Sequence, residues 1–450
     1  MQQNITDRFL DGIFALKDQP LPESARHHAR RCLLDYLAAT VAGAKMAEEE
    51  TKKLLHSLGG TDPHASLIGL NRKASLLTAS FINGISAHTA ELDDGVISGI
   101  IHPGAPVFSA LIPVAQRYRV NGEDLLLGAI AGYQAAVRIA DAIQPSHKLR
   151  GYHATATCGA LGAVVGILMM RNAAPSIVKN ALSAAAVSAT GSLKVLEDNS
   201  QLKPINAGHA AASAITAVAI AECGFVGPAD VFAGNAGFLA MMADTCDSDK
   251  LFGLTDEPLA IERVYFKPYA ACRYCHPAIE ATLALRAQGD IDTRSIKRIR
   301  VSTYELAVKH HDHTAVENVS SAKMSIPFSV AVALEYGAAG VAEYSEQAVQ
   351  SDSVARVMKA VEVQADETYT AAFPRRTSAK VEITFNDGRV VTSEVHEPKG
   401  DPGKPLSDEE VSEKFVSLAM FSGMRESRAR EVCDLVWQLP AHADRFYTLI

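Results

Sequence analysis

The feature that most constrains this chain is a series of alanine-rich stretches whose apolar residues recur at helical spacing. The first runs from Pro22 to Gly43 and interleaves basic and apolar positions with the period of one face of an α-helix. Similar stretches, separated by Gly, Pro and Asn, cover residues 73–93, 105–120, 122–143, 154–170, 176–190 and 208–222. Because small side chains suit closely packed helices, the first ~260 residues are predicted to be all-helical.

The pattern changes in the second half of the chain. Branched and polar residues alternate over residues 296–304, 379–385 and 389–395, which is the period of a β-strand. The sequence Asn-Asp-Gly at residues 386–388 is typical of a hairpin turn between two strands. This part of the chain therefore predicts a mixed α+β fold.

Helical spacing returns near the C-terminal end. Ser407 is followed by three acidic residues, which is a typical helix start, and helical spacing continues through Trp437. We therefore predict a mainly α protein. Its large all-helical domain is built from residues 1–266 and 397–450, and a smaller α+β lid domain is inserted over residues 267–396.

The charge and composition of the chain indicate which kinds of partner to expect. The formal net charge is −8 and basic clusters are short, so nucleic acid is not expected as a partner. A small anionic ligand is compatible with this charge, because a few converging cations set the potential of a pocket. The apolar stretches are shorter than the ~20 residues that span a membrane, and no secretory signal precedes them. We expect a cytoplasmic protein that binds no membrane.

Residues of the kind that move protons gather in two places in the helical half. Asp93 and Asp94 lie where a predicted helix gives way to a glycine-rich loop, and His102 lies further along that loop. Neighbouring carboxylates perturb one another's pKa, and a carboxylate can fix the tautomer of a histidine. An Asp pair that caps helices is the alternative reading. His153 precedes the helix at 154–170, where the helix dipole favours a neutral imidazole; a structural histidine is the alternative.

Cationic residues precede and follow the change of pattern. Lys203 lies in a predicted non-helical link, as a candidate to bind a carboxylate or as a solvated loop lysine. Lys267, Arg273 and His276 crowd the boundary between the predicted domains, where ligand clefts are common.

The same boundary segment contains Cys272-x-x-Cys275-His276, which formally matches a haem attachment site. Haem attachment requires an exported protein, and a zinc site requires a second pair of ligands at suitable spacing. The sequence shows neither an export signal nor such a pair, so we expect no metal and no cofactor.

Five segments, taken in order, resemble the MmgE/PrpD family, which includes 2-methylcitrate dehydratase, cis-aconitate decarboxylase and iminodisuccinate epimerase. They are LDDG to HPG at 92–104, GYHATATCGALGA at 151–163, KPINAG at 203–208, KPYAACRYCHPAIEA at 267–281 and AKMSIPFSVAVAL at 322–334. The resemblance implies a helical domain with an inserted lid, a homodimer, and a metal-free active site between the domains. Its catalytic residues would be Asp93, His102 and His153, and its substrate-binding residues Lys203, Lys267, Arg273 and His276.

The resemblance leaves the reaction open. Decarboxylase members of the family carry a His where this chain has Cys272 and a Tyr near the position of Phe328, so decarboxylation is disfavoured. We predict a metal-independent dehydratase that acts on a hydroxy-polycarboxylate such as 2-methylcitrate or citrate, with His102 and His153 as base and acid in either order. The alternatives are an epimerase of a dicarboxylate such as iminodisuccinate, a cis-aconitate decarboxylase, and a non-catalytic dimer that binds carboxylates.

Overall fold

The computed structural model describes residues 4–18, 20–59, 63–197, 199–253, 257–289 and 291–450. The protein is mainly α, as predicted, with two small sheets among the described residues. The chain divides into two compact units. Unit 1 contains Met1–Leu193, Leu202–Tyr265 and Ser407–Ile450, and unit 2 contains Lys194–Gln201 and Phe266–Leu406.

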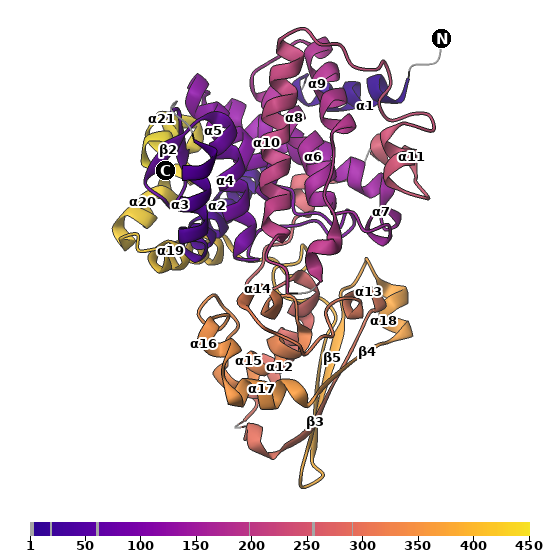
Figure 1. The fold of residues 1–450 in the computed structure, drawn as a ribbon, viewed down its shortest axis with the longest axis vertical. Coiled ribbons are helices and arrows are strands. Elements are labelled where there is room, and N and C mark those ends of the chain that lie inside the picture. The colour runs from indigo at the N-terminus through magenta and orange to yellow at the C-terminus, as the bar shows by residue number, and fades with distance from the viewer. Residues whose placement is uncertain (1–3, 19, 60–62, 198, 254–256, 290) are drawn as a thin grey trace. The chain divides into compact units, whose positions relative to one another are not determined.

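Unit 1 is a bundle of helices with one short hairpin (Figure 1). Its α-helices in the described residues are α1 (Ile5–Phe14), α2 (Glu23–Met46), α3 (Glu48–Leu58), α4 (Leu76–Thr89), α5 (Gly104–Tyr118), α6 (Gly122–Ile143), α7 (Ser146–Leu149), α8 (Ala154–Met170), α9 (Pro175–Val187), α10 (Lys203–Glu222), α11 (Phe238–Met242), α19 (Asp408–Phe421), α20 (Glu426–Trp437) and α21 (Leu439–Leu449). Short 3-10 turns are η1 (Ala15–Lys17), η2 (Leu193–Leu196), which runs into unit 2, η3 (Ser248–Leu251) and η4 (Ala260–Arg263).

The centre of unit 1 explains the abundance of small residues. Helix α8 is buried along its whole length and packs most extensively against α6. A Cβ placed on Gly162 of α8 would lie 2.5 Å from the carbonyl oxygen of Gly132 in α6. Only glycine permits that approach of two backbones, because any larger side chain would overlap the neighbouring helix.

The last helices of the chain return to unit 1, where α19 packs against α2 (Figure 1). Lys414 of α19 donates to Asp35 Oδ1 of α2 at 2.6 Å and to the carbonyl oxygen of Leu92 at 2.7 Å. A buried charge pair of this kind is costly to break, because either partner alone would be left desolvated. The C-terminal segment therefore holds the loop that follows α4.

The sequence prediction for unit 1 is wrong in three details. The helix predicted to continue to residue 93 ends at Thr89. Residues predicted as the start of a helix at 73 instead form β2 (Arg72–Ala74), which pairs antiparallel with β1 (Ala65–Leu67); the side chain of Ser75 then caps α4 by accepting from the N–H of Thr78. Lys203, predicted to lie in a non-helical link, is the first residue of α10. Pro204 follows it at the start of that helix. Proline has no backbone N–H, and this is tolerated there because an N–H at the start of a helix has no partner within the helix.

Unit 2 contains a four-stranded sheet of order β4-β3-β5-β6. The strands are β3 (Ile296–Thr303), β4 (Val361–Ala365), β5 (Ala379–Phe385) and β6 (Val390–Val395), with β3 and β4 parallel and the other pairs antiparallel. The predicted hairpin turn joins β5 to β6, with Gly388 at a φ of +87°. Alternate residues of β5 are buried, which is the reason for its two-residue period.

Helices pack against this sheet, with α12 on β5 and β6 (Figure 1). The helices of unit 2 are α12 (His276–Ala287), α13 (Glu305–Val308), α14 (Val319–Ala322), α15 (Ile326–Tyr336), α16 (Glu346–Val349), α17 (Asp352–Lys359) and α18 (Glu367–Ala372), with 3-10 turns η5 (Arg273–Cys275) and η6 (Thr293–Ser295).

Two helices, α6 and α10, are long and apolar enough to cross a membrane by length and composition alone. The apolar window of α6 is 83% buried inside the protein. Helices in the core of a globular protein are equally long and apolar, so the apolar composition of α6 is explained by its burial inside the protein.

Candidate active site

A strained loop carries His102 between α4 and α5. Gly95 pairs with Tyr265 and Val96 with Ile101 as isolated β-bridges, and these contacts close a turn in which Ile100 has a φ of +46°. A β-branched residue rarely adopts this conformation, and such outliers cluster at functional sites. The backbone N–H of His102 donates to Thr155 Oγ1 at 3.1 Å, which ties the loop to the start of α8.

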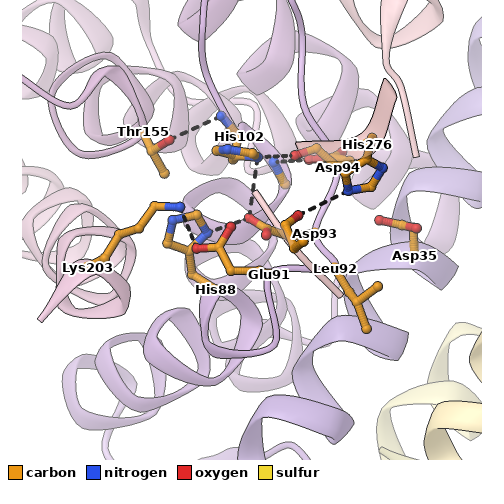
Figure 2. Close-up of polar contacts among 12 residues, drawn as sticks. Asp35, His88, Glu91, Leu92, Asp93, Asp94, His102, Thr155, Lys203 and His276 are labelled. Atoms are coloured by element: carbon orange, nitrogen blue, oxygen red, sulfur yellow. Dashed lines mark hydrogen bonds and ion pairs between the residues drawn. The ribbon is translucent and has the colours of Figure 1, made fainter. Parts of the chain in front are cut away.

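Asp93 lies between two imidazoles in Figure 2. Its Oδ2 is 2.6 Å from Nδ1 of His88 and 3.8 Å from Nδ1 of His102. The partner of Asp93 at hydrogen-bond distance is therefore His88, the next-to-last residue of α4, which the sequence reasoning missed. The signal that could have found it is a histidine at the end of a buried helix, five residues before the aspartate.

His88 is fully buried, and its Nε2 has no hydrogen-bond partner among the described residues. Because Nδ1 donates to Asp93, Nε2 would carry the lone pair in a neutral form of this ring. The ring centroid of His88 lies 5.1 Å from that of His102 and 5.6 Å from that of His153. Three imidazoles thus form one cluster, which we call the histidine cluster.

Hydrogen bonds define the tautomer of His102. Its Nδ1 lies 2.6 Å from the carbonyl oxygen of Asp94, which can only accept, so Nδ1 carries the proton. In the neutral ring Nε2 is then a proton acceptor. The His102 side chain is 13% exposed, whereas His88 is fully buried.

His153 has the opposite arrangement. The Asn206 amide nitrogen lies 3.1 Å from His153 Nδ1 and 3.4 Å from the carbonyl oxygen of Ser192. A carbonyl can only accept, so the amide nitrogen faces both groups and His153 Nδ1 accepts. In the neutral ring Nε2 is then the donor. Burial, and then the neighbouring His88, Lys203 and His102, hold the pKa of His153 well below its ordinary value, so this ring is neutral at neutral pH.

Lys203 extends from the start of α10 to an ion pair with Glu91 (Figure 2). Both side chains are nearly buried, at 11% and 4% exposure. Glu91 has a φ of +54°, a conformation that is uncommon for a residue other than glycine, asparagine or aspartate. The chain bends at this residue, and its carboxylate reaches the lysine.

Asp94 is the second of the adjacent carboxylates and has a separate environment. Its Oδ2 is 2.6 Å from the hydroxyl of Tyr133, and its Oδ1 accepts from the N–H of Gly104 at 3.0 Å. Burial, together with the charge of Asp35, raises the pKa of Asp94 to about 8. Asp94 is therefore mostly protonated at neutral pH, and its backbone carbonyl rather than its carboxylate contacts His102.

The other predicted substrate-binding residues belong to unit 2. Arg273 is buried in an ion pair with Asp401, and Thr377 Oγ1 donates to the other oxygen of that carboxylate at 3.2 Å. His276 Nδ1 lies 3.2 Å from the Arg273 guanidinium, and its Nε2 lies 3.0 Å from the carbonyl oxygen of Ala271. Lys267 is fully buried.

These contacts argue against the haem or zinc reading of Cys272-x-x-Cys275-His276. Both ring nitrogens of His276 already have hydrogen-bond partners, so neither is available to coordinate a metal without breaking a contact. Within the part of the chain that the structure describes, no group of three or more His, Cys, Asp or Glu is arranged to hold a metal ion.

Unit 1 thus brings together all three predicted catalytic residues, Asp93, His102 and His153, with Lys203. It adds His88 and Glu91 to them. Asp93, His88 and Glu91 come from the end of α4 and the loop after it, His102 from the next loop, and His153 and Lys203 from the starts of α8 and α10. Such a set of carboxylates, imidazoles and an ammonium group can abstract a carbon-bound proton and stabilise the charge that develops.

Comparison with known proteins defines the class. The MmgE/PrpD N-terminal domain matches residues 8–249 and the MmgE/PrpD C-terminal domain matches residues 269–439. The chain belongs to the MmgE/PrpD family.

Individual relatives point to a lyase. The chain is 25% identical to the cis-aconitate decarboxylase-like protein oryM of Aspergillus oryzae (strain ATCC 42149 / RIB 40), over 98% of this chain and 95% of that protein. It is 24% identical to cis-aconitate decarboxylase of Aspergillus terreus (strain NIH 2624 / FGSC A1156), over 95% and 92%. It is 23% identical to the Homo sapiens cis-aconitate decarboxylase, over 92% and 88%. These relatives and the family support a lyase-type function.

Proposed function

We propose that this protein is a metal-independent lyase that removes water from a small hydroxy-polycarboxylate, such as 2-methylcitrate or citrate. The observation that carries the proposal is the pair of opposite tautomers in the histidine cluster. His102 offers an acceptor nitrogen that can serve as the base, and His153 offers an N–H that can hydrogen-bond the departing oxygen. These tautomers favour His102 over His153 as the base.

In the first step His102 Nε2 takes the proton from the carbon beside a carboxylate. The electron pair moves toward that carboxylate, and the Asp93 charge 3.8 Å from His102 Nδ1 stabilises the imidazolium that forms. His88 then acts as a positioning residue, because its bond to Asp93 fixes the carboxylate beside His102. The partly exposed His102 is assigned as base in preference to the buried His88, because the base must touch the substrate.

In the second step the carbon–oxygen bond breaks and the double bond forms. A neutral imidazole at His153 donates a hydrogen bond to the departing oxygen and does not itself give up its proton. The proton that completes the water molecule comes from Lys203, whose ammonium has three N–H donors, so its contact with Glu91 is compatible with a contact to substrate. His102 then releases its proton to solvent, and Lys203 takes up a proton from solvent. Both side chains thereby return to their starting protonation states.

Carboxylate binding by Lys267, Arg273 and His276 is the remaining part of the proposal and rests on the family resemblance. Arg273 is neutralised by Asp401 in its own unit, so it would bind a carboxylate as part of a charge network rather than as an isolated cation. An Arg273→Lys variant tests this role, since lysine keeps the charge but not the two-pronged geometry. We expect a higher KM with a small change in kcat.

Decarboxylation is the second candidate, because the relatives named above are cis-aconitate decarboxylases or decarboxylase-like. The same cluster would protonate the carbon after carbon dioxide leaves. Cys272 and Phe328, where the family's decarboxylases carry His and Tyr, weigh against it. An epimerase would use two proton-transfer groups on opposite faces of one carbon, and a binding protein would need the cations but not the proton-transfer groups.

The test is proton NMR of the purified protein in deuterium oxide, with chelator present, on citrate, 2-methylcitrate, cis-aconitate and iminodisuccinate in turn. Conversion of a hydroxy acid to an alkene supports the dehydratase. Carbon dioxide release from cis-aconitate establishes the decarboxylase, and exchange of the proton on the stereocentre with racemisation establishes the epimerase. Absence of any exchange, with carboxylate binding by calorimetry, would leave the non-catalytic binder.

The family resemblance also implies a homodimer, and we retain this as a proposal. Exposed apolar side chains on and just after α10 support it: Ile205 and Ile220 are 38% and 39% exposed, and Phe225 is 67% exposed. Light scattering of the purified protein measures the mass directly, and a monomer at micromolar concentration would refute the proposal.

A further inference from the structure

The first turn of α10 presents two side chains to the histidine cluster. Lys203 and Asn206 are three positions apart on this helix and therefore lie on the same face of it. Lys203 pairs with Glu91, and the amide nitrogen of Asn206 is 3.1 Å from Nδ1 of His153. This turn thus carries the proton donor of the proposed second step and contacts the ring that donates a hydrogen bond in the same step.

The carbonyl of Ser192 fixes the orientation of the Asn206 amide. Ser192 forms an isolated β-bridge with Tyr152, the residue before His153, and its carbonyl oxygen lies 3.4 Å from the amide nitrogen of Asn206. If the amide were turned over, two oxygens that can only accept would face each other. The amide nitrogen therefore faces both the carbonyl and the ring.

The backbone that carries Ser192 is held closely against the start of α8. The carbonyl oxygen of Gly191 accepts from the N–H of His153 at 3.0 Å. Gly191 has a φ of +146°, and a Cβ at this position would lie 2.3 Å from the Cβ of Ala156. Glycine permits both the conformation and the close approach.

The position of one proton decides what His153 can do. Burial holds the pKa of His153 well below its ordinary value, so the ring is neutral and has one N–H. The titratable and charged groups around the ring that act in the same direction are His88, Lys203 and His102, and Glu91 opposes them. Because the Asn206 amide donates to Nδ1, the single proton of the ring is on Nε2.

We propose that Asn206 is a positioning residue that places the proton of His153 on Nε2 and thereby makes this ring a hydrogen-bond donor to the departing oxygen. The catalytic part of this inference rests on the proposed dehydratase reaction. The tautomer is a property of the protein alone and can be measured without turnover, so the two proposals can fail separately.

Asn206→Asp tests the proposal, because aspartate has the shape of asparagine but its carboxylate can only accept. Nδ1 of His153 should then hold a proton, and Nε2 of the neutral ring should have none. The carboxylate should also raise the pKa of His153. Proton–carbon NMR of the full chain with labelled histidine reports both properties through the chemical shift of Cδ2, and His153→Gln assigns the signal. A ring that keeps the parent tautomer in Asn206→Asp would overturn the proposal.

The pH dependence of kcat is the second readout. In the parent the neutral ring already donates. In Asn206→Asp only the imidazolium has an N–H at Nε2, so kcat should fall by roughly 10- to 100-fold as the pH rises through the pKa that NMR gives for His153 in that variant. Saturating substrate is required, since the added negative charge should also raise KM for a polycarboxylate.

Asn206→Ala separates the placement of a proton from packing. It removes the amide without adding an acceptor, so at high pH its kcat should fall less than that of Asn206→Asp. A packing role predicts the reverse order, because aspartate fills the space of asparagine and alanine does not, and that order would overturn the proposal.

Asn235→Asp is the matched control, because Asn235 is exposed between α10 and α11 and the change adds the same charge. Its kcat and its His153 signal should equal those of the parent. A kcat in Asn206→Asp that follows the control across the pH range would overturn the catalytic role. A reversed tautomer in a protein that dehydrates no hydroxy acid would refute the dehydratase and its departing oxygen, while confirming that Asn206 sets the tautomer.

Discussion

Replacement of His102 by glutamine tests the central assignment. Glutamine can retain a hydrogen bond to the Asp94 carbonyl, which His102 Nδ1 contacts at 2.6 Å, but it has no basic nitrogen. Removal of a general base typically costs a factor of about 10² to 10⁴ in rate, which corresponds to roughly 3 to 5.5 kcal/mol in the activation free energy. We expect kcat to fall by that factor.

The fold should survive this change. The His102 side chain is 13% exposed, and its hydrogen bond to a backbone carbonyl is worth about 1 kcal/mol. We therefore expect a KM within about threefold of the parent value, since a group that acts only in the transition state contributes little to substrate binding. Urea unfolding measures the stability of the same preparation.

The assay follows the ultraviolet absorbance of the new double bond, with deuterium exchange by NMR as a second readout. His209→Gln is the matched control, because His209 is exposed on α10 and lies outside the histidine cluster; its kcat should equal that of the parent. A His102→Gln variant that retains kcat within about threefold would refute the assignment of His102 as the base, and His88 would become the candidate.

Three further predictions concern Asp93, Asp94 and Gly84. Asp93→Asn should lower kcat by roughly 10- to 100-fold with the fold retained, because the imidazolium that forms at His102 loses the charge 3.8 Å from its Nδ1; unchanged kinetics would remove Asp93 from the mechanism. Burial raises the pKa of Asp94 from 3.8 to about 8, so the folded state holds a proton that the unfolded state releases. Stability from this proton is present below pH ~4 and is lost as the pH rises to ~8; urea unfolding across that range should show a shallower decline in Asp94→Asn than in the parent. Gly84→Ala should destabilise the protein by about 1 to 3 kcal/mol, since its Cβ would lie 2.6 Å from the Cα of Gly208, whereas Gly289→Ala, with nothing within 4 Å, should leave the melting temperature nearly unchanged.

Several local features could be predicted from the sequence because they depend on neighbouring residues. Helical spacing and small side chains gave the α class, and alternation with an Asn-Asp-Gly turn gave the β5–β6 hairpin. His153 was expected before a helix and lies at the N-terminal boundary of α8. The interpretation of residue 73 as helical was wrong, since the tertiary pairing of β2 with β1 overrides the helical pattern of a few residues.

Partners that are distant in the sequence required the tertiary structure. The bond from Lys414 to the carbonyl of Leu92 spans 322 positions, and the pair of Lys203 with Glu91 spans 112. Periodicity reports which face of a helix is apolar but not which helix packs against it. No local pattern contains that information.

The sequence by itself determined the mainly α class and the presence of Asp93, His102, His153 and Lys203 as candidates for proton chemistry. The tertiary structure decided that His88 is the hydrogen-bond partner of Asp93. It also decided that His102 and His153 have opposite tautomers and that burial raises the pKa of Asp94 to about 8. The physical reason is that a proton's position depends on burial and on the group a few ångströms away, and packing, rather than chain order, sets both.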